Sequence, residues 1–171
     1  MNENPAASAT KSKASKPEGL PDSPGVIMFP PLLYVGTLLL GLVLNFFWPV
    51  HLFQSMWVRL GGAGLVVASG ALAIWAQKTM KRAGTNVMPS QPSLNIVTSG
   101  PFSFTRNPIY VANAIAYLGL TLILKTAWPI FLFVPMLVVL NWGIIRREER
   151  YLEAKFGDIY LAYKKRVRRY I

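Results

Sequence analysis

Four long apolar runs, separated by polar segments, dominate the pattern of the chain. They cover approximately residues 26–50, 56–76, 108–124 and 127–145, and each is close to the length of about 20 residues that spans a bilayer as a helix. Lys125 and Thr126 alone separate the last two runs, which predicts an antiparallel helical hairpin. The sequence therefore predicts an all-α integral membrane protein with four transmembrane helices.

Small residues are concentrated in the second run, where glycine, alanine and serine recur between residues 61 and 73. A surface of small side chains lets another helix approach closely. We expect this packing to occur within the chain rather than between two copies of it.

The polar segments differ in character. Residues 1–25 are rich in alanine, serine, lysine and proline, which is typical of a disordered basic tail. A signal peptide is the alternative, but the apolar run that follows is longer than a signal peptide requires. Residues 77–107 carry several turn-forming glycines and prolines and predict a functional loop. From residue 146 onward, apolar side chains recur every three or four positions among charged ones, which predicts amphipathic C-terminal helices on a membrane domain covering residues 26–171.

The charge distribution predicts the orientation of the chain in the membrane. The 171 residues carry a formal net charge of +11, and every lysine and arginine except Arg59 and Lys125 flanks the tail, the loop at 77–107 or the C-terminal segment. Because basic residues mark the cytoplasmic side of membrane helices, we expect both termini in the cytoplasm, at a bacterial inner membrane. Basic residues beside long apolar runs also indicate the lipid bilayer, and not nucleic acid, as the partner.

The composition excludes several kinds of active site. The chain has no cysteine, and its one histidine is His51. Thiol nucleophiles, disulfides and multi-histidine metal sites are therefore excluded, and we expect no bound metal. Beyond the first 25 residues the acidic side chains are Glu148, Glu149, Glu153 and Asp158. A site that needs a carboxylate must recruit the C-terminal segment or the N-terminal tail.

The second half of the chain contains an ordered series of motifs. They are Gly84-Thr85-Asn86-Val87, Val97-Thr98-Ser99-Gly100-Pro101-Phe102, Thr105-Arg106-Asn107-Pro108-Ile109-Tyr110, Glu148-Glu149-Arg150-Tyr151-Leu152, Phe156-Gly157-Asp158-Ile159-Tyr160 and Val167-Arg168-Arg169. In this order they resemble the isoprenylcysteine carboxyl methyltransferases, in a bacterial-type form, and their phospholipid methyltransferase relatives. The resemblance covers residues 84–171 and implies methyl transfer from S-adenosylmethionine. That family opens a membrane helix with Arg-His-Pro or Arg-Asn-Pro, and the asparagine version found here leaves the acceptor open among lipids, isoprenoids and small carboxylates.

The methyl donor determines what its site must contain. S-adenosylmethionine presents a sulfonium cation, an ammonium, a carboxylate and an adenine, so the site needs an anion, aromatic faces and hydrogen-bond donors. The candidate donor-binding residues are Thr98, Gly100, Pro101, Phe102, Asn107, Tyr110, Glu148, Glu149, Tyr160 and Tyr163. Arg106 is the candidate to hold an acceptor anion, because a guanidinium binds a carboxylate through two hydrogen bonds.

The main candidates also have simpler structural interpretations. Asn107, which precedes a proline, fits a helix N-cap, and Arg106 fits an anchor in the lipid headgroups. Glu148 and Glu149 lie among arginines and fit surface ion pairs, one of the two being structural. The basic residues at 164–169 are more typical of an anionic-lipid contact than of a pocket.

The predicted function is S-adenosylmethionine-dependent methylation of a lipid-like or isoprenoid acceptor, a carboxylate being one option, at the cytoplasmic membrane face. One alternative is an NADPH-dependent reductase of the sterol or isoprenoid type, which has a similar membrane architecture. The phosphates of NADPH favour basic residues, whereas Glu148 and Glu149 favour a cationic donor. The other alternative is a non-catalytic membrane scaffold. The acceptor atom and the oligomeric state stay open.

Overall fold

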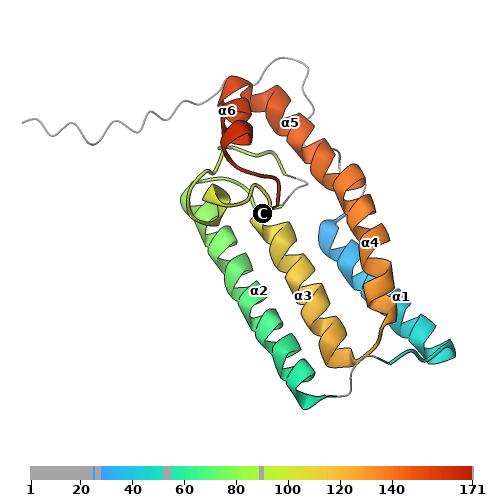
Figure 1. The fold of residues 1–171 in the computed structure, drawn as a ribbon. Helices are drawn as coiled ribbons and strands as arrows, with labels where there is room; N and C mark the ends of the chain where they lie inside the picture. Colours follow the sequence, from blue (N-terminus) through green and yellow to red (C-terminus); the bar gives the residue numbers. More distant parts are fainter. Residues whose placement is uncertain (1–24, 26–27, 52–54, 89–90, 171) are drawn as a thin grey trace, which may run out of the picture.

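The computed structural model describes residues 25, 28–51, 55–88 and 91–170. The expected tail at residues 1–25 therefore lies, except for Gly25, outside the described residues. The helices are α1 (Pro30–Phe47), α2 (Met56–Arg82), α3 (Pro108–Leu124), α4 (Trp128–Leu140), α5 (Arg146–Phe156) and α6 (Asp158–Arg166) (Figure 1). A π-helical turn, Asn141–Ile145, joins α4 to α5, and a 3-10 turn, Gly100–Ser103, precedes α3. The described part of the chain contains no strand beyond one isolated bridge, so the all-α prediction is confirmed.

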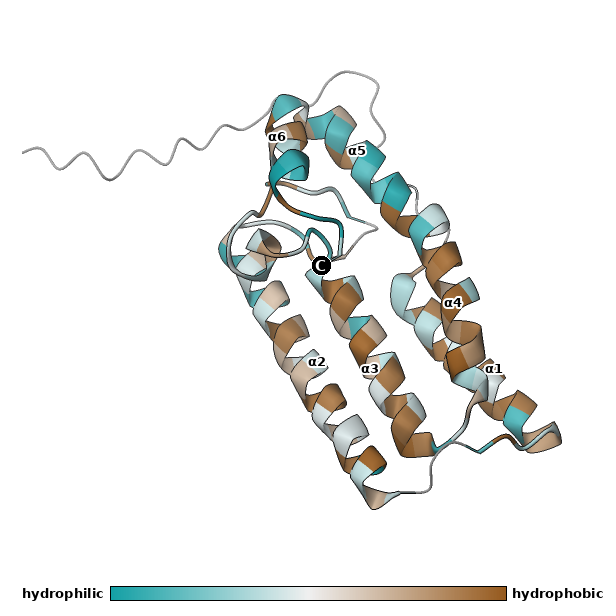
Figure 2. Ribbon diagram, viewed as in Figure 1, coloured by the Kyte–Doolittle hydropathy of each residue, from teal (hydrophilic) through white to brown (hydrophobic). Residues whose placement is uncertain are grey.

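Helices form at all four places where the sequence predicts a span. Among the described residues, three continuous helical stretches are long and apolar enough to cross a membrane, namely Pro30–Phe47, Met56–Arg82 and Trp128–Phe156. The fourth, Pro108–Leu124, is apolar but has 17 residues. The apolar bodies of the helices and the polar residues gathered at one end of the bundle are visible in Figure 2. The described part of the chain is therefore helical, with three helical stretches that could span a membrane.

α2 and α3 are the most closely packed pair of helices in the bundle. A Cβ atom added to Gly62 would lie 2.7 Å from the backbone oxygen of Gly119, and one added to Gly119 would lie 2.7 Å from the backbone oxygen of Gly62. Ser69 and Ala76 continue the buried face of α2. The predicted close packing of the small-residue run within the chain is therefore present, although Gly61, on the neighbouring face, has open space beside it.

α1 and α4 form a second pair, in which Gly41 lies directly against the ring of Pro129. α3 and α4 are consecutive, as the predicted hairpin requires, but they contact each other sparsely. Aromatic side chains fill the space between the pairs, with the ring of Tyr117 lying 6.4 Å from Tyr34 and 5.5 Å from Phe133. The buried core of the membrane part is thus built on tyrosine at the junction of the two pairs.

At the end of the bundle remote from the charged segments, the connection after α1 contacts the segment between α3 and α4. The indole Nε1 of Trp128 donates to the carbonyl of Trp48 at 2.7 Å, and His51 forms an isolated bridge with Thr126. His51 itself is exposed.

The glycine contact yields a stability prediction with a matched neighbour. We expect Gly62→Ala to destabilise the protein by about 1–3 kcal/mol, because its methyl group would overlap the backbone of α3. Gly61→Ala should be neutral or slightly stabilising, because alanine favours a helix and space is open there. Thermal unfolding of the two detergent-solubilised variants measures the difference, and equal melting temperatures would contradict the packing described.

Candidate active site

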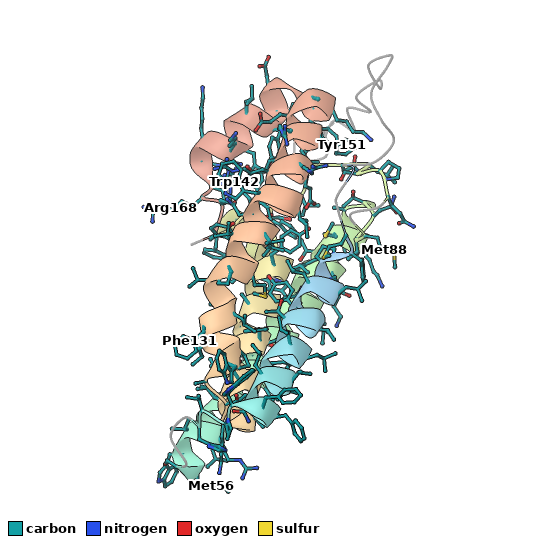
Figure 3. The ribbon with its side chains drawn as sticks, turned by 90° about the vertical axis from the view of Figure 1, so that its right-hand side faces the viewer. Met56, Met88, Phe131, Trp142, Tyr151 and Arg168 are labelled. Atoms are coloured by element: carbon teal, nitrogen blue, oxygen red, sulfur yellow. The ribbon has the colours of Figure 1, made fainter. Side chains whose placement is uncertain are left out.

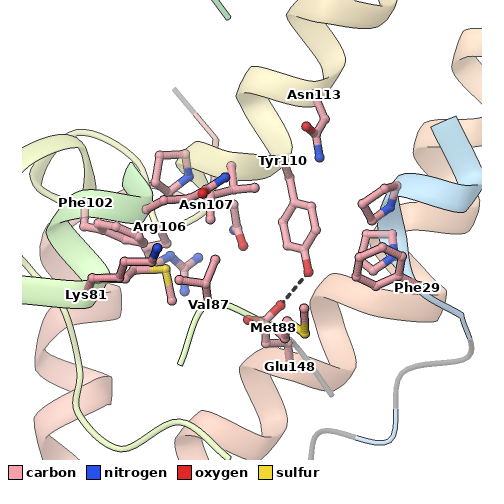
Figure 4. A pocket seen from close by; sticks show the side chains of 16 residues that line it. Phe29, Lys81, Val87, Met88, Phe102, Arg106, Asn107, Tyr110, Asn113 and Glu148 are labelled. Atoms are coloured by element: carbon pink, nitrogen blue, oxygen red, sulfur yellow. Dashed lines mark hydrogen bonds between the residues drawn. The ribbon is translucent and has the colours of Figure 1, made fainter. Parts of the chain in front are cut away.

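A cavity of about 440 Å³ lies at the polar end of the bundle, where the loop between α2 and α3 meets α1 and α5 (Figure 4). Most of its wall is apolar, with the exceptions of Lys81, Arg106, Asn107, Asn113 and Glu148 together with the amide of Gln77 and the hydroxyl of Tyr110. The remaining lining residues are Phe29, Pro30, Pro31, Met80, Val87, Met88, Phe102, Pro108 and Ile109. A few charged groups thus face a largely apolar cavity, which is the usual composition of a small-molecule binding site.

The start of α3 is held by the C-terminal segment. Thr105 Oγ1 and Asn107 Nδ2 both donate to the carbonyl of Arg169, at 3.1 and 3.0 Å, and the Arg106 amide donates to the carbonyl of Arg168 at 3.0 Å. Asn107 occupies the N-cap position with Pro108 following, as predicted, but its side chain makes no capping hydrogen bond. The side chain is used instead to fasten the end of the chain beside the cavity.

Glu149 is the centre of a buried ion-pair cluster. Arg169 donates to it through two hydrogen bonds, from Nε to Oε1 at 3.0 Å and from Nη2 to Oε2 at 2.7 Å. Arg106 Nη1 lies 3.1 Å from the same Oε1. The side chains of Glu149 and Arg106 are only 6% and 7% exposed. Asn141 completes the cluster by accepting from Arg169 Nη1 and from the hydroxyl of Tyr170.

Arg106 keeps unused hydrogen-bonding capacity. Its Nε and Nη1 atoms are buried and donate no hydrogen bond to the described residues, although Nη1 lies within ion-pair distance of Glu149. The side chain lines the cavity (Figure 4). A buried donor without an acceptor costs free energy. An anion bound in this cavity would supply acceptors for these two nitrogen atoms.

Glu148 faces the cavity, unlike its neighbour Glu149. Its Oε2 accepts a hydrogen bond of 2.8 Å from the hydroxyl of Tyr110, which rises from the first turn of α3 (Figure 4). Successive residues of a helix point about 100° apart, so one carboxylate of the pair turns to the cavity while the other turns to Arg169. The structure therefore separates the two glutamates into different surroundings.

A smaller cavity, of about 70 Å³, adjoins the first. It shares Phe102, Arg106 and Glu148 with the larger one and adds Tyr160 and Tyr163 from α6. Burial raises the pKa of Tyr163 to about 12, and its protonated hydroxyl donates to the carbonyl of Phe102 at 2.7 Å. Burial also raises the pKa of Tyr160, with the charge of Glu149 adding to the effect. Both phenols are therefore neutral hydrogen-bonding groups at physiological pH.

Comparison with known proteins identifies the family. The sequence profile of a family described as phospholipid methyltransferase matches residues 57–159, which are more than half of the chain. The chain belongs to the phospholipid methyltransferase family. This family includes the isoprenylcysteine carboxyl methyltransferases, so the resemblance seen in the motifs is confirmed. An uncharacterized protein from Haemophilus influenzae is 44% identical over 63 residues, which cover 32% of this chain and 98% of that relative. No solved structure matches the chain.

In this phospholipid methyltransferase family member, most sequence-predicted site residues meet at the two cavities. The residues brought together are Phe102, Arg106, Asn107, Tyr110, Glu148, Glu149, Tyr160 and Tyr163. Three others, Thr98, Gly100 and Pro101, line neither cavity. Thr98 is exposed, Pro101 is fully buried, and Gly100 has a φ of +60° with the site of a Cβ only 3.0 Å from Thr79 Oγ1.

Sequence reasoning missed several cavity residues. Gln77, Met80 and Lys81 come from the last turns of α2, and no motif distinguishes them in the sequence. Arg169 had a signal, since it lies in the Val-Arg-Arg motif, but its positive charge is equally typical of a lipid-facing tail. Within the described residues no group of three or more potential ligands is arranged to hold a metal ion.

The buried cluster yields a second stability prediction. We expect Glu149→Gln to destabilise the protein by about 3–5 kcal/mol, because it leaves two arginines without their buried counter-charge. Glu153 lies on α5 like Glu149, and its ion pair with Lys164 of α6 is partly exposed. The matched change Glu153→Gln should therefore cost about 0–1 kcal/mol. Thermal unfolding of both variants in detergent tests this. Similar losses in the two variants would show that Glu149 is not the structural member of the glutamate pair.

Proposed function

We propose that this protein transfers a methyl group from S-adenosylmethionine to a lipid-like or isoprenoid acceptor at the cytoplasmic face of a membrane. The observation that carries the proposal is the pairing, in one largely apolar cavity, of an available carboxylate with an arginine that has buried, unused donors. Glu148 supplies the first and Arg106 the second. Membership of a methyltransferase family supports the reaction class.

The lining residues fit the groups of the donor and acceptor. Glu148 provides a negative charge for an ammonium or sulfonium, and Tyr110 fixes that carboxylate through its hydroxyl. Phe102 and Tyr110 offer aromatic faces. Arg106 provides hydrogen-bond donors for a carboxylate, and we assign it to the binding of an anionic group of the acceptor.

When bound, S-adenosylmethionine supplies an electrophilic methyl group, which an acceptor nucleophile takes by in-line displacement as the sulfonium becomes a neutral thioether. The protein needs no general base when the acceptor is a carboxylate. The contribution of the cavity is to align the acceptor through Arg106 and to exclude water by its apolar wall. The absence of histidine from the described site is consistent with this division of labour.

The membrane arrangement supports an amphipathic acceptor. We infer four spans, with α3 as the fourth, because its 17 residues extend about 26 Å against a hydrocarbon core of about 30 Å and its partner α2 shields one side. The basic residues gather at the cavity end, which supports a topology with that end and both termini on the cytoplasmic side of a bacterial inner membrane. The apolar side chains of Phe29 and Pro31 line the cavity and suit a lipid-like acceptor that reaches the site from the membrane surface.

A binding experiment tests the proposal. Calorimetry on the detergent-purified full chain should show binding of S-adenosylmethionine and of S-adenosylhomocysteine. Glu148→Gln should weaken binding of the methyl donor by about 10- to 100-fold, the value of a hydrogen-bonded charge, while Glu153→Gln on the same helix should leave it unchanged.

Two outcomes would contradict the proposal. One is binding of NADPH without binding of S-adenosylmethionine, which would indicate a membrane reductase. The other is a folded protein that binds neither compound, which would indicate a scaffold. Equal affinity of the Glu148→Gln and Glu153→Gln variants for the methyl donor would remove Glu148 from the site.

A further inference from the structure

A second, basic pocket lies on the outer side of the cluster around Glu149. It has a volume of about 390 Å³ and collects four cationic side chains, Arg146, Arg150, Lys164 and Arg169, against two carboxylates. Lys164 is paired with Glu153, and Arg169 with Glu149. Within the described residues Arg146 and Arg150 have no carboxylate partner, so the pocket retains an excess of positive charge.

Trp142 joins this basic pocket to an apolar groove. The guanidinium of Arg146 lies over the indole of Trp142, 3.7 Å from the ring centroid. The same indole lines a groove of about 480 Å³ between α3 and α4, whose wall is almost wholly apolar and includes Ile115, Leu118, Val134 and Val138. A continuous surface therefore runs from aliphatic side chains, over one tryptophan, to a cluster of cations.

The helix that carries this surface is long enough to cross the hydrocarbon core of a bilayer. Trp128, at the remote end of the bundle, and Arg146 are separated by 18 helical steps, or about 27 Å, close to the roughly 30 Å of a hydrocarbon core. Phe131 and Trp142 project from the same side of the helix at different heights (Figure 3). Trp142 is 60% exposed and Val134 65% exposed. The groove thus lies at the level of acyl chains and the basic pocket at the level of headgroups.

We infer that the groove and the basic pocket together bind an anionic phospholipid, with its phosphate among Arg146, Arg150 and Lys164 and an acyl chain along the groove. The charge excess selects an anionic headgroup, and the continuity with the groove selects a lipid over free phosphate. Glu149 lines both this pocket and the smaller cavity of the active site, and its partner Arg169 lines the basic pocket. The lipid site therefore adjoins the cavity assigned to methyl transfer, and Tyr110 lines both that cavity and the groove.

Native mass spectrometry of the delipidated full chain, without methyl donor, tests the inference independently of the proposed function. Titration should show preference for phosphatidylglycerol over phosphatidylcholine with the same acyl chains. The double variant Arg146→Gln, Arg150→Gln should lose at least about tenfold in affinity for phosphatidylglycerol. The matched variant Arg59→Gln, Lys125→Gln, which removes two positive charges at the remote end, should retain the preference.

A charge-conserving variant, Arg146→Lys, Arg150→Lys, should keep the preference and so separates charge from fold, and thermal unfolding confirms that each variant is folded. The inference is overturned if the glutamine variant binds phosphatidylglycerol like the unmodified protein, or if the remote variant loses the preference equally. It is also overturned if inorganic phosphate displaces the lipid completely, because the groove would then contribute nothing.

Discussion

The position of the Glu149 carboxylate in a site almost closed to water constrains much of the surrounding structure. A charge buried to this degree is tolerated only with partners, and two arginines from distant parts of the chain meet this need. Arg106 comes from the loop that precedes α3, and Arg169 from the C-terminal segment. The cluster thus ties α5, the start of α3 and the end of the chain together, and the active-site cavity exists because these segments are held there.

The division of labour between Glu148 and Glu149 depends on helix geometry. The helix from α4 to α5 is interrupted by a π-helical turn just before the two glutamates, and such turns are frequent at functional sites. An extra residue in one turn changes the direction of every side chain that follows. Glu148 then reaches Tyr110 and the cavity, whereas Glu149 faces Arg169. Two chemically identical neighbours thus have different partners because of a backbone feature.

The apolar runs predicted where helices form, because about 17 to 20 apolar residues in sequence have few other uses. They did not predict which helices pair, since Gly62 and Gly119 lie far apart in the sequence and meet only in three dimensions. The motif residues Arg106 and Glu148, which their side-chain chemistry identified in the sequence, line the same cavity. Thr98, Gly100 and Pro101 share a motif with Phe102, but their roles depend on how the loop packs onto α2, which composition does not encode. The π-helical turn has no sequence signature either, so the sequence could not assign the two glutamates.

The glycine contact between α2 and α3, and the seating of Gly41 on Pro129 between α1 and α4, divide the bundle into two stiff halves. Within each half, backbone meets backbone or a proline ring, and little sliding is possible. Between the halves the contacts are made by tyrosine and phenylalanine side chains, and the hydroxyls of Tyr34 and Tyr117 donate across the junction to the carbonyls of Tyr110 and Pro129. The cavity takes walls from both halves, with Pro31 and Glu148 on one and Met80 and Tyr110 on the other. Its width consequently depends on how the two halves sit against each other, and the tyrosine hydrogen bonds between them fix that arrangement.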